Sequence, residues 1–349
     1  MLREKISLIV PCYNEEEVLP YFYEEYCRTA DQLPAYDTEV IFVDDGSRDA
    51  TLKIIKDFAG RDERIKYISF SRNFGKEAAI YAGFEYAGGD YTAILDADLQ
   101  DPPSLLPEMM RWIREEGYDS VATRRVTRKG EPPVRSFFAR RFYRLMNRIS
   151  STEIMDGSRD YRLMTRQFQE AVMQMGEYNR FAKGIFGWVG FKTKWMEFEN
   201  MERKAGETKW SFWKLLLYSI EGILGFSTAP LAMVSVLGIL VCLTAFVFLV
   251  VILVKTLCFG DPVAGWPSLV CVILMLGGIQ MLCMGILGLY LSKTYLEVKK
   301  RPIYLCRETN IGKKKEQAGT KMASLFCRIL FCHSASAAVS AASMTLSMS

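Results

Sequence analysis

Three aspartates follow a short apolar run in the stretch AILDADLQDPP, residues 93–103. Asp96 and Asp98 are two positions apart, so both side chains point the same way at the end of an extended strand, and Gln100 continues the spacing. Asp101 follows, before two prolines end the run. Oxygen ligands of this kind suit Mg²⁺ or Mn²⁺. The stretch is therefore either an exposed acidic turn or the site of a hard cation.

Two further polar clusters also come directly after apolar runs. Residues 13–15, Tyr-Asn-Glu, follow ISLIVP, and residues 44–47, Asp-Asp-Gly-Ser, follow TEVIFV. A DDGS sequence is by itself an acceptable turn. The only histidine is His333, near the end of the chain. A Ser-His-Asp triad or a histidine-ligated metal is thus excluded from the main body, where a general base must be a carboxylate, Lys, Tyr or Cys.

The elements that must position these clusters alternate along residues 5–125. Strands are expected at 6–11, 38–47, 64–70 and 90–98, and helices at 15–33, 47–60 and 75–89. A Ser or Asp cap is expected to start the second helix and a Gly to end it. This alternation predicts βαβ units and a mainly parallel sheet, whose ligands bind beyond the carboxyl ends of the strands. All three polar clusters fall at those ends.

The second half of the chain has a membrane character. Residues 229–254 and 267–292 carry no charge and are mostly apolar, and each exceeds the roughly 20 residues needed to cross a bilayer. Lys and Arg crowd the outer flanks, as in KKRP at 299–302. The two apolar stretches predict two transmembrane helices in the plasma membrane. The positive-inside rule predicts that both termini and the N-terminal domain are in the cytoplasm.

Two stretches are predicted to lie at the membrane surface. In residues 135–149 the apolar side chains and the arginines fall largely on opposite faces of a helix, a pattern typical of an interfacial helix. An ordinary surface helix packed on the core is the alternative. Residues 206–228 contain an aromatic-rich second interfacial helix. Residues 293–349 are expected to form a cytoplasmic tail with a disordered end.

The amino-acid composition limits the classes of binding partner that the chain is expected to have. The 44 basic and 40 acidic residues nearly balance, which gives no case for nucleic-acid binding. None of the nine cysteines forms a C-x-x-C pair, so they are interpreted as small apolar residues in a reducing compartment. Small residues within 276–290 would permit a second copy to pack closely as a homo-oligomer.

Four motifs, in this order and spacing, give a family resemblance: IVPCYNEEE, VDDGSRDAT, SRNFGKEAAIYAGF and LDADLQDPP. The chain resembles family 2 glycosyltransferases of the GT-A fold over residues 5–305. Within them it is similar to polyprenyl-phosphate glycosyltransferases, which include bactoprenol glucosyltransferases and dolichol-phosphate mannose synthases. The resemblance implies an α/β GT-A domain, Rossmann-like and mainly parallel, at residues 1–205.

The resemblance also implies a reaction. A nucleotide-sugar, UDP-glucose, gives its sugar with inversion to undecaprenyl phosphate at the cytoplasmic membrane face. Mannose and N-acetylglucosamine stay open as donor sugars, and an inactive membrane scaffold is a non-enzymatic alternative, disfavoured because the acidic motif is intact. A processive polysaccharide synthase is disfavoured because no Q-x-x-R-W motif is present, and a Rossmann oxidoreductase because no G-x-G-x-x-G follows the first strand.

Residue roles carry over from the matching motifs. The resemblance assigns nucleotide-sugar binding to Pro11, Tyr13, Asn14, Glu15, Asp44, Asp45, Lys76 and Asp96. It assigns the metal, Mg²⁺ or Mn²⁺, to Asp96, Asp98 and Gln100, and catalysis to Asp98 and Asp160.

The motif around Asp160 departs from the family pattern. The chain reads RDYRLM at 159–164 where the family has GDFRL, so Arg159 replaces a glycine. The acidic residue is usually taken as the base, but a phosphate acceptor is already ionised near neutral pH. Asp160 is therefore expected to orient a substrate more than to abstract a proton. The alternative is a helix N-cap, because DYRLMTRQFQEAV looks helical.

Binding the phosphate group of the lipid acceptor requires positively charged side chains. The segment RKAGETKW, 203–210, resembles the family's R-x-x-G-x-S-K, with Thr208 in place of Ser. The candidates for lipid-phosphate binding are Arg124, Arg135, Arg140, Arg203 and Lys209. Simple attraction to lipid headgroups is the alternative for any one of these arginines.

Overall fold

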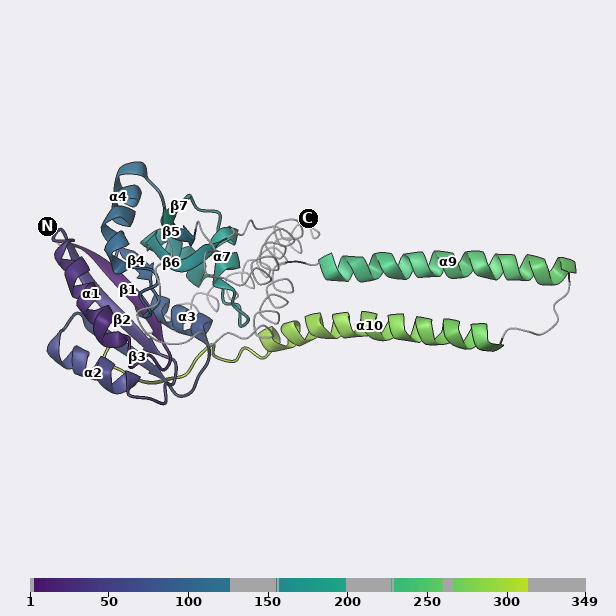
Figure 1. The fold of residues 1–349 in the computed structure, drawn as a ribbon, viewed down its shortest axis with the longest axis horizontal. Helices are drawn as coiled ribbons and strands as arrows, with labels where there is room; N and C mark the ends of the chain where they lie inside the picture. The colour runs from purple at the N-terminus through teal and green to yellow at the C-terminus, as the bar shows by residue number, and fades with distance from the viewer. Residues whose placement is uncertain are drawn as a thin grey trace, which may run out of the picture. The chain divides into compact units, whose positions relative to one another are not determined.

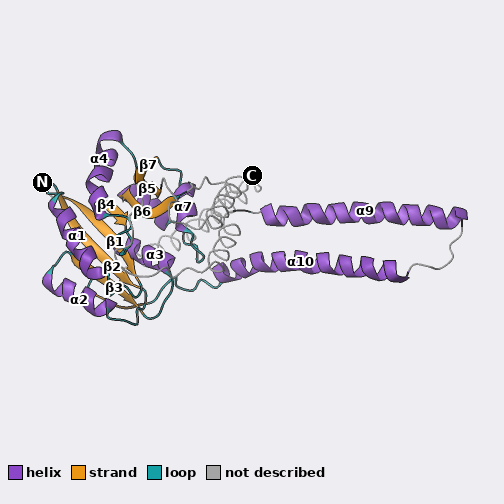
Figure 2. Cartoon of the chain, viewed as in Figure 1, coloured by secondary structure: helices purple, strands orange, loops and turns teal. Residues whose placement is uncertain are grey.

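The computed structural model describes residues 3–125, 155, 157–198, 227, 229–259 and 266–312. Within these ranges the chain forms one eight-stranded sheet with the order β7-β5-β6-β4-β1-β2-β3-β8 (Figures 1 and 2). The strands are β1 (Glu4–Cys12), β2 (Tyr36–Asp44), β3 (Ile65–Phe70), β4 (Tyr91–Ile94), β5 (Ser120–Arg125), β6 (Ser158–Thr165), β7 (Thr193–Phe198) and β8 (Cys306–Thr309).

The centre of the sheet is parallel and its edges are mixed. Strands β3, β2, β1 and β4 run parallel, whereas β6 is antiparallel to both β4 and β5, and β8 is antiparallel to β3. The parallel centre confirms the predicted βαβ alternation, and the loops after β1, β2 and β4 meet at one edge of the sheet. This edge carries the polar clusters.

Helices cover both faces of the sheet. The helices α1 (Leu19–Asp31), α2 (Thr51–Arg61) and α4 (Leu106–Glu116), the last preceded by the short η1 (Pro103–Leu105), pack on one face. On that face Leu8 of β1 shares a buried core with Phe22 and Met109. The other face is covered by α3 (Lys76–Tyr86) and α6 (Arg166–Met173), with α7 (Ala182–Trp188) following in the chain. Alternation of buried side chains along β1 produces the two cores.

A glycine sets the distance between α3 and the sheet. A Cβ atom at Gly83 would lie 2.2 Å from Cγ2 of Ile9 in β1, which is far inside van der Waals contact. Only a glycine lets the helix approach the sheet this closely. Because α3 begins at Lys76, this contact also fixes the position of that lysine.

One local expectation and one alternative reading were wrong. The second helix begins after Ala50 and runs past Gly60 to Arg61, without a Ser or Asp cap. Ser47 is instead used by the backbone of Asn14. Residues 160–165 form part of β6 and not of a helix, and α6 starts only at Arg166, where Thr165 provides the N-cap.

Two long apolar helices follow the sheet. Helix α9 (Ala229–Phe259) and helix α10 (Trp266–Val298) contain the stretches Ala229–Phe248 and Met275–Val298, which are long and apolar enough to cross a membrane. Large apolar side chains are exposed along both, including Phe246 and Leu291. Such surfaces need an apolar partner, which a bilayer supplies. The two predicted interfacial helices, 135–149 and most of 206–228, lie outside the described residues.

The chain returns to the sheet after α10, where only a tail was expected. Strand β8 pairs with β3, and Leu305 accepts a 3.0 Å backbone hydrogen bond from Ser71. The ring of Tyr304 stacks on Phe70 at 4.8 Å, and its hydroxyl donates to Glu85 of α3 at 2.5 Å. The segment after the second apolar helix is thus part of the folded domain.

Candidate active site

The loops after β1 and β2 are joined by hydrogen bonds. The backbone N–H of Asn14 donates to Ser47 at 3.0 Å, and the Asn14 side chain accepts from the N–H of Arg48 at 2.9 Å. Asn14 has a φ of 54°, in the left-handed region that asparagine tolerates better than most residues. Glu15 donates from its N–H to the hydroxyl of Thr51 at 2.8 Å. The predicted nucleotide loop is thus held rigidly against the start of α2.

Asp44 and Asp45 are almost fully buried, and both serve the loops around them. Oδ2 of Asp44 accepts from the hydroxyl of Ser69 at 2.8 Å, while Asp45 accepts from the N–H groups of Phe74 and Gly75 at 2.6 and 2.9 Å. Burial raises the pKa of Asp45 to about 6, although these hydrogen bonds favour its ionised form. The pair therefore fixes the loop that leads into α3.

Gly46 allows the two loops to touch. Its φ is 67°, and a Cβ atom there would lie 2.6 Å from the carbonyl carbon of Arg72. A side chain at this position would push the β2 loop away from the β3–α3 loop. The contact brings the start of α3, and with it Lys76, toward the acidic strand end.

Lys76 is the centre of the site. Its Nζ lies 2.8 Å from Oδ2 of Asp96, at the end of β4, and also pairs with Oδ2 of Asp160 in β6. Three elements far apart in sequence therefore meet at one ammonium group. Burial alone would lower the pKa of Lys76, but the charges of Asp160 and Asp96 offset this and raise it above its ordinary value. The lysine is positively charged at neutral pH.

Asp160 lies between two lysines. Besides Lys76, the Nζ of Lys183 in α7 lies 3.6 Å from its Oδ1 and donates a 2.8 Å hydrogen bond to the carbonyl oxygen of Ser158. Burial raises the pKa of Asp160, but the two ammonium groups outweigh that effect and hold it below its ordinary value. Asp160 is therefore ionised and binds a proton only weakly near pH 7.

The acidic loop after β4 is strained and clamped. Leu99 has a φ of 56°, which is rare for a branched residue and marks a position held by its surroundings. Asp98 accepts a 3.1 Å hydrogen bond from the N–H of Gln100. Arg159 then donates to Oε1 of Gln100 at 3.3 Å and places its Nε 3.5 Å from Oδ1 of Asp101. The arginine that replaces the family glycine thus ties β6 to the acidic loop.

Asp101 is a buried carboxyl group with incomplete hydrogen bonding. Its Oδ1 has no hydrogen-bond partner among the described residues, and its side chain is 2% exposed. Burial raises its pKa to about 7, and the positive charge of Arg159 offsets only part of this rise. Asp101 is accordingly partly protonated near neutral pH, unlike Asp160.

The family model described as "Glycosyl transferase family 2" matches residues 7–172. The "Putative glycosyltransferase CsbB" of Bacillus subtilis (strain 168) is 43% identical over 309 residues, which cover 88% of this chain and 93% of that protein. The "Prophage bactoprenol glucosyl transferase homolog" of Escherichia coli (strain K12) is 43% identical over 87% of this chain and 98% of that protein.

The chain belongs to glycosyl transferase family 2. It is a glycosyltransferase with a GT-A fold and two candidate membrane helices. A solved mannosyltransferase from Pyrobaculum calidifontis, in complex with GDP-Man and Mn²⁺, is 16% identical, with a TM-score of 0.42 over 85% of this chain and 87% of that one.

The fit of a divalent metal to this family 2 glycosyltransferase can be judged from its oxygens. No group of three or more His, Cys, Asp or Glu side chains in the described ranges converges as a complete metal site. Mg²⁺, however, is commonly held by one or two carboxylates together with substrate phosphates. Asp96 and Asp98, two residues apart at the end of β4, offer such a partial set, so the residues fit a metal that arrives with a diphosphate.

The predicted lipid-phosphate residues are only partly placed. Arg124, at the end of β5, forms an ion pair with Glu197 of β7 and contacts the sulfur of Met155 at 3.5 Å. Its charge is therefore already balanced by a neighbouring strand. The other four candidates, Arg135, Arg140, Arg203 and Lys209, lie outside the described residues.

Two site residues were missed by sequence reasoning. Lys183 contacts Asp160 across 23 positions of sequence, and no local motif marks it. Glu77 is adjacent to Lys76, and both of its carboxylate oxygens lie within 3.2 Å of the N–H of Ala182, at the start of α7. Burial raises the pKa of Glu77 to about 7. Glu77 thereby ties α3 to the helix that carries Lys183.

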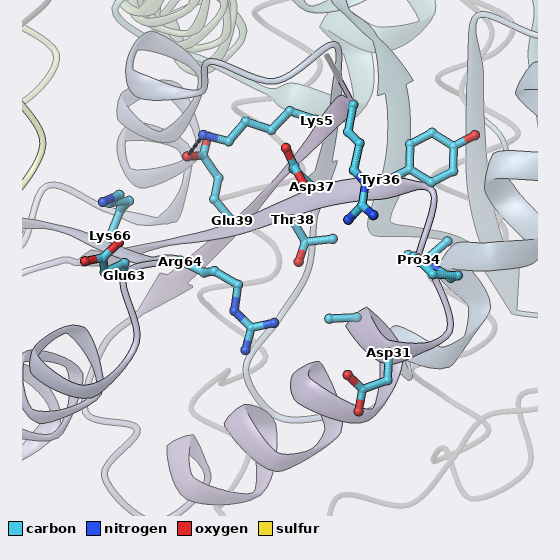
Figure 3. Close-up of a pocket in the computed structure, with 13 residues that line it drawn as sticks. Lys5, Asp31, Pro34, Tyr36, Asp37, Thr38, Glu39, Glu63, Arg64 and Lys66 are labelled. Atoms are coloured by element: carbon cyan, nitrogen blue, oxygen red, sulfur yellow. Dashed lines mark ion pairs between the residues drawn. The ribbon is translucent and has the colours of Figure 1, made fainter. Parts of the chain in front are cut away.

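A groove of about 570 Å³ lies at the other end of the strands, away from these residues (Figure 3). It is formed by the start of β1, the end of α1 and the beginnings of β2 and β3, and Lys5 pairs with Glu39 inside it. Its charged residues are four basic and four acidic side chains: Arg3, Lys5, Arg64, Lys66, Asp31, Asp37, Glu39 and Glu63. Parallel sheets bind ligands at the opposite edge, so this groove is not the candidate site.

Proposed function

We propose that this enzyme transfers glucose from UDP-glucose to a polyprenyl phosphate at the cytoplasmic face of a membrane, with inversion at the anomeric carbon. The name of the Escherichia coli relative, a bactoprenol glucosyl transferase homolog, supports the class of acceptor and the sugar. The observation that carries the proposal is the meeting of Asp96, Asp160 and Lys76 at the carboxyl edge of the sheet. This arrangement suits a reaction in which a diphosphate leaves and a phosphate attacks.

The nucleoside would lie over the loops after β1 and β2. Pro11, Tyr13, Asn14 and Glu15 provide the contact surface, while the carboxylates of Asp44 and Asp45 keep the loops in register through hydrogen bonds within the protein. A rigid loop loses little conformational entropy when a ligand binds. We therefore assign Asp44 and Asp45 a positioning role in nucleoside binding, because both carboxylates are almost fully buried and hydrogen-bonded within the protein.

The diphosphate would lie beside Lys76 and the acidic loop, which are already in contact through Asp96. Asp96, Asp98 and Gln100 would hold Mg²⁺ or Mn²⁺, which supplies Lewis-acid stabilisation of the leaving diphosphate. Lys76 contributes a second positive charge next to the metal site, because its Nζ lies 2.8 Å from Oδ2 of Asp96. Cations placed at a leaving group stabilise the charge that develops there.

Asp160 is assigned as a positioning carboxylate and not as a base. Its pKa is held below the ordinary value by Lys76 and Lys183, so it is a poor proton acceptor. The phosphate acceptor is already ionised near neutral pH and needs no base. An oxygen of that phosphate attacks the anomeric carbon and forms the new C–O bond. The bond to the diphosphate breaks from the opposite side, and UDP leaves with the electron pair.

The apolar helices support a reaction at a membrane. Stretches of 20 and 24 residues in α9 and α10 have the length and composition of membrane spans. Basic flanks outside both stretches support a topology with both termini and the catalytic domain in the cytoplasm. A lipid acceptor would then present its phosphate at the surface on which the domain lies.

The test uses membranes that contain this protein and undecaprenyl phosphate. They are incubated with radiolabelled UDP-glucose, GDP-mannose or UDP-N-acetylglucosamine, with and without Mg²⁺ or Mn²⁺, and label extracted into organic solvent is counted. We expect metal-dependent lipid label from UDP-glucose. Label from another donor alone would correct the sugar. An absence of label from every donor, with folded protein, would contradict the proposal and favour an inactive membrane scaffold.

A further inference from the structure

A second cavity, of about 260 Å³, lies beside Asp160 and has no role in the donor site described above. It is formed by β6, α7 and β7, which are labelled in Figure 1. Three of its lining side chains are cationic and three are aromatic: Arg159, Arg162, Lys183, Phe186, Phe191 and Trp195. Among the described residues that line it there is no carboxylate. The cavity therefore combines positive charge with an apolar wall.

Arg162 is the decisive residue of this cavity. It is 4% exposed, and its Nη1 donates to the hydroxyl of Ser120 at 2.9 Å. In the described part of the chain, its Nε has no hydrogen-bond partner and no carboxylate forms an ion pair with it. Buried charges in proteins are normally paired, because leaving one uncompensated is strongly unfavourable.

Aromatic rings hold the Arg162 guanidinium in place. Its central carbon lies 4.7 Å from the ring centroid of Phe186 and 5.4 Å from that of Trp195. Burial lowers the pKa of Arg162 to about 9, although the negative charge of Asp160 offsets part of this fall, and the group is still charged at neutral pH. Such cation–π contacts recover part of the lost solvation but do not neutralise the charge. An anionic ligand would neutralise it.

Lys183 connects this cavity to the reacting groups. Its side chain lines the cavity, and its Nζ lies 3.6 Å from Oδ1 of Asp160. An anion bound between Arg162 and Lys183 would therefore lie next to the carboxylate that also pairs with Lys76. Lys183, which lines the cavity, contacts Oδ1 of Asp160, whereas Lys76, which we assign to the diphosphate, pairs with Oδ2.

We infer that this cavity binds a phosphate monoester, with Arg162 and Lys183 contacting its oxygens and the aromatic side chains contacting the first apolar group attached to it. Sites that enclose a whole drug-sized ligand measure roughly 300–1,000 Å³, so 260 Å³ suits a head group better than a complete nucleotide-sugar. An arginine fork matches the geometry of phosphate oxygens. The identification of this monoester as the acceptor lipid rests on the proposed function.

The binding test uses the full chain in detergent and farnesyl phosphate as a short polyprenyl phosphate. Trp195 lies beside the guanidinium, so we expect a saturable change in tryptophan emission that disappears in Trp195→Phe. Arg162→Met should raise the dissociation constant roughly 10- to 100-fold, since a charge-assisted hydrogen bond is lost. Arg111→Met, an exposed arginine of α4, is the matched control and should bind as the wild type does.

Control ligands and variants distinguish a lipid phosphate from other anions. Farnesol should not bind comparably, because it lacks the phosphate. Inorganic phosphate that saturates the signal as tightly as farnesyl phosphate would overturn the assignment to a lipid. Unchanged binding of farnesyl phosphate to folded Arg162→Met would overturn the cavity assignment itself. If Arg162→Met does not fold, Lys183→Met takes its place. We expect the same rise in the dissociation constant for farnesyl phosphate, and unchanged binding would again overturn the cavity assignment.

A kinetic arm separates this inference from the proposed function. If the wild type forms no labelled lipid from any donor, the proposed function fails. If the wild type forms it and Arg162→Met shows an unchanged KM for the lipid acceptor, only the cavity assignment fails. The expected result is a raised acceptor KM with an unchanged KM for the nucleotide-sugar.

Discussion

The Nζ of Lys76 lies 2.8 Å from Oδ2 of Asp96, although Lys76 is the first residue of α3 and Asp96 lies in the loop after β4. The same ammonium pairs with Asp160, in a strand that is antiparallel to β4. This relationship joins the helix that follows the nucleotide loops to the acidic motif and to β6. An incoming diphosphate would meet one preorganised cation and, if a metal is bound, a second.

Replacing Lys76 tests the central cation. Lys76→Met removes the charge that stabilises the leaving diphosphate and leaves Asp96 and Asp160 without their common partner. We expect kcat/KM to fall by roughly 10²- to 10³-fold, the usual effect of removing one preorganised donor. Lys53→Met, an exposed lysine of α2, is the control and should retain wild-type turnover. Near-normal turnover of Lys76→Met would remove Lys76 from the mechanism.

Asp98→Asn tests the metal. The substitution keeps the shape of the side chain but removes a negatively charged ligand, so transfer should be abolished at every Mg²⁺ concentration while membrane insertion is intact. Membrane fractionation and the lipid-label assay measure the two properties separately. Asp57→Asn changes an exposed aspartate of α2 and should have no effect. Full activity of Asp98→Asn would exclude a metal role for this residue.

Gly83→Ala tests the packing that positions Lys76. The new Cβ atom would overlap Cγ2 of Ile9, so we expect a loss of roughly 1–3 kcal/mol in unfolding free energy and lower activity. The loss should shrink when Ile9 is already Ala, because the overlapping atoms are gone. Gly60→Ala, at a helical position with open space, should be neutral or stabilising. Equal effects of the two glycine substitutions would contradict the close approach of α3.

The raised pKa of Asp101 should make the stability of the protein depend on pH. Its pKa is 3.8 when the side chain is solvated and about 7 in the folded protein, so the folded state binds more protons between these values. The stability of the wild type relative to Asp101→Asn should therefore be greatest below about pH 4 and fall by roughly 1.4 kcal/mol per pH unit up to about pH 7. Melting temperatures of both proteins in detergent, from pH 5 to 8, measure this difference. A constant difference over that range would contradict the buried, protonated state of Asp101.

The sequence was sufficient to predict the central sheet and one half of the site. Asp96 follows an apolar strand and Lys76 begins a helix, and each lies within a recognisable motif. Local sequence patterns were therefore enough to identify both as candidate site residues. Asp160 was placed by its motif, but its element was ambiguous. Tyr161 and Leu163 alternate with polar residues as in a strand, whereas the same stretch continues directly into α6.

Other parts of the site depend on contacts that no local pattern encodes. Lys183 and Arg162 become functional candidates only when α7 packs beside β6, since neither stands in a recognisable motif. Strand β8 is four residues long, and its pairing with β3 depends on the return of the chain after α10. Arg159 was noted as a departure from the family, but its contacts with Gln100 and Asp101 required the folded loop.

The most direct measurement is a time course of the purified enzyme in detergent with UDP-[¹⁴C]glucose, Mg²⁺ and undecaprenyl phosphate, with released UDP and lipid-bound label counted together. We predict one UDP released for each label transferred and no labelled lipid when the polyprenyl phosphate is omitted. UDP release without labelled lipid, or no reaction at all from protein with an intact melting transition, would contradict the account.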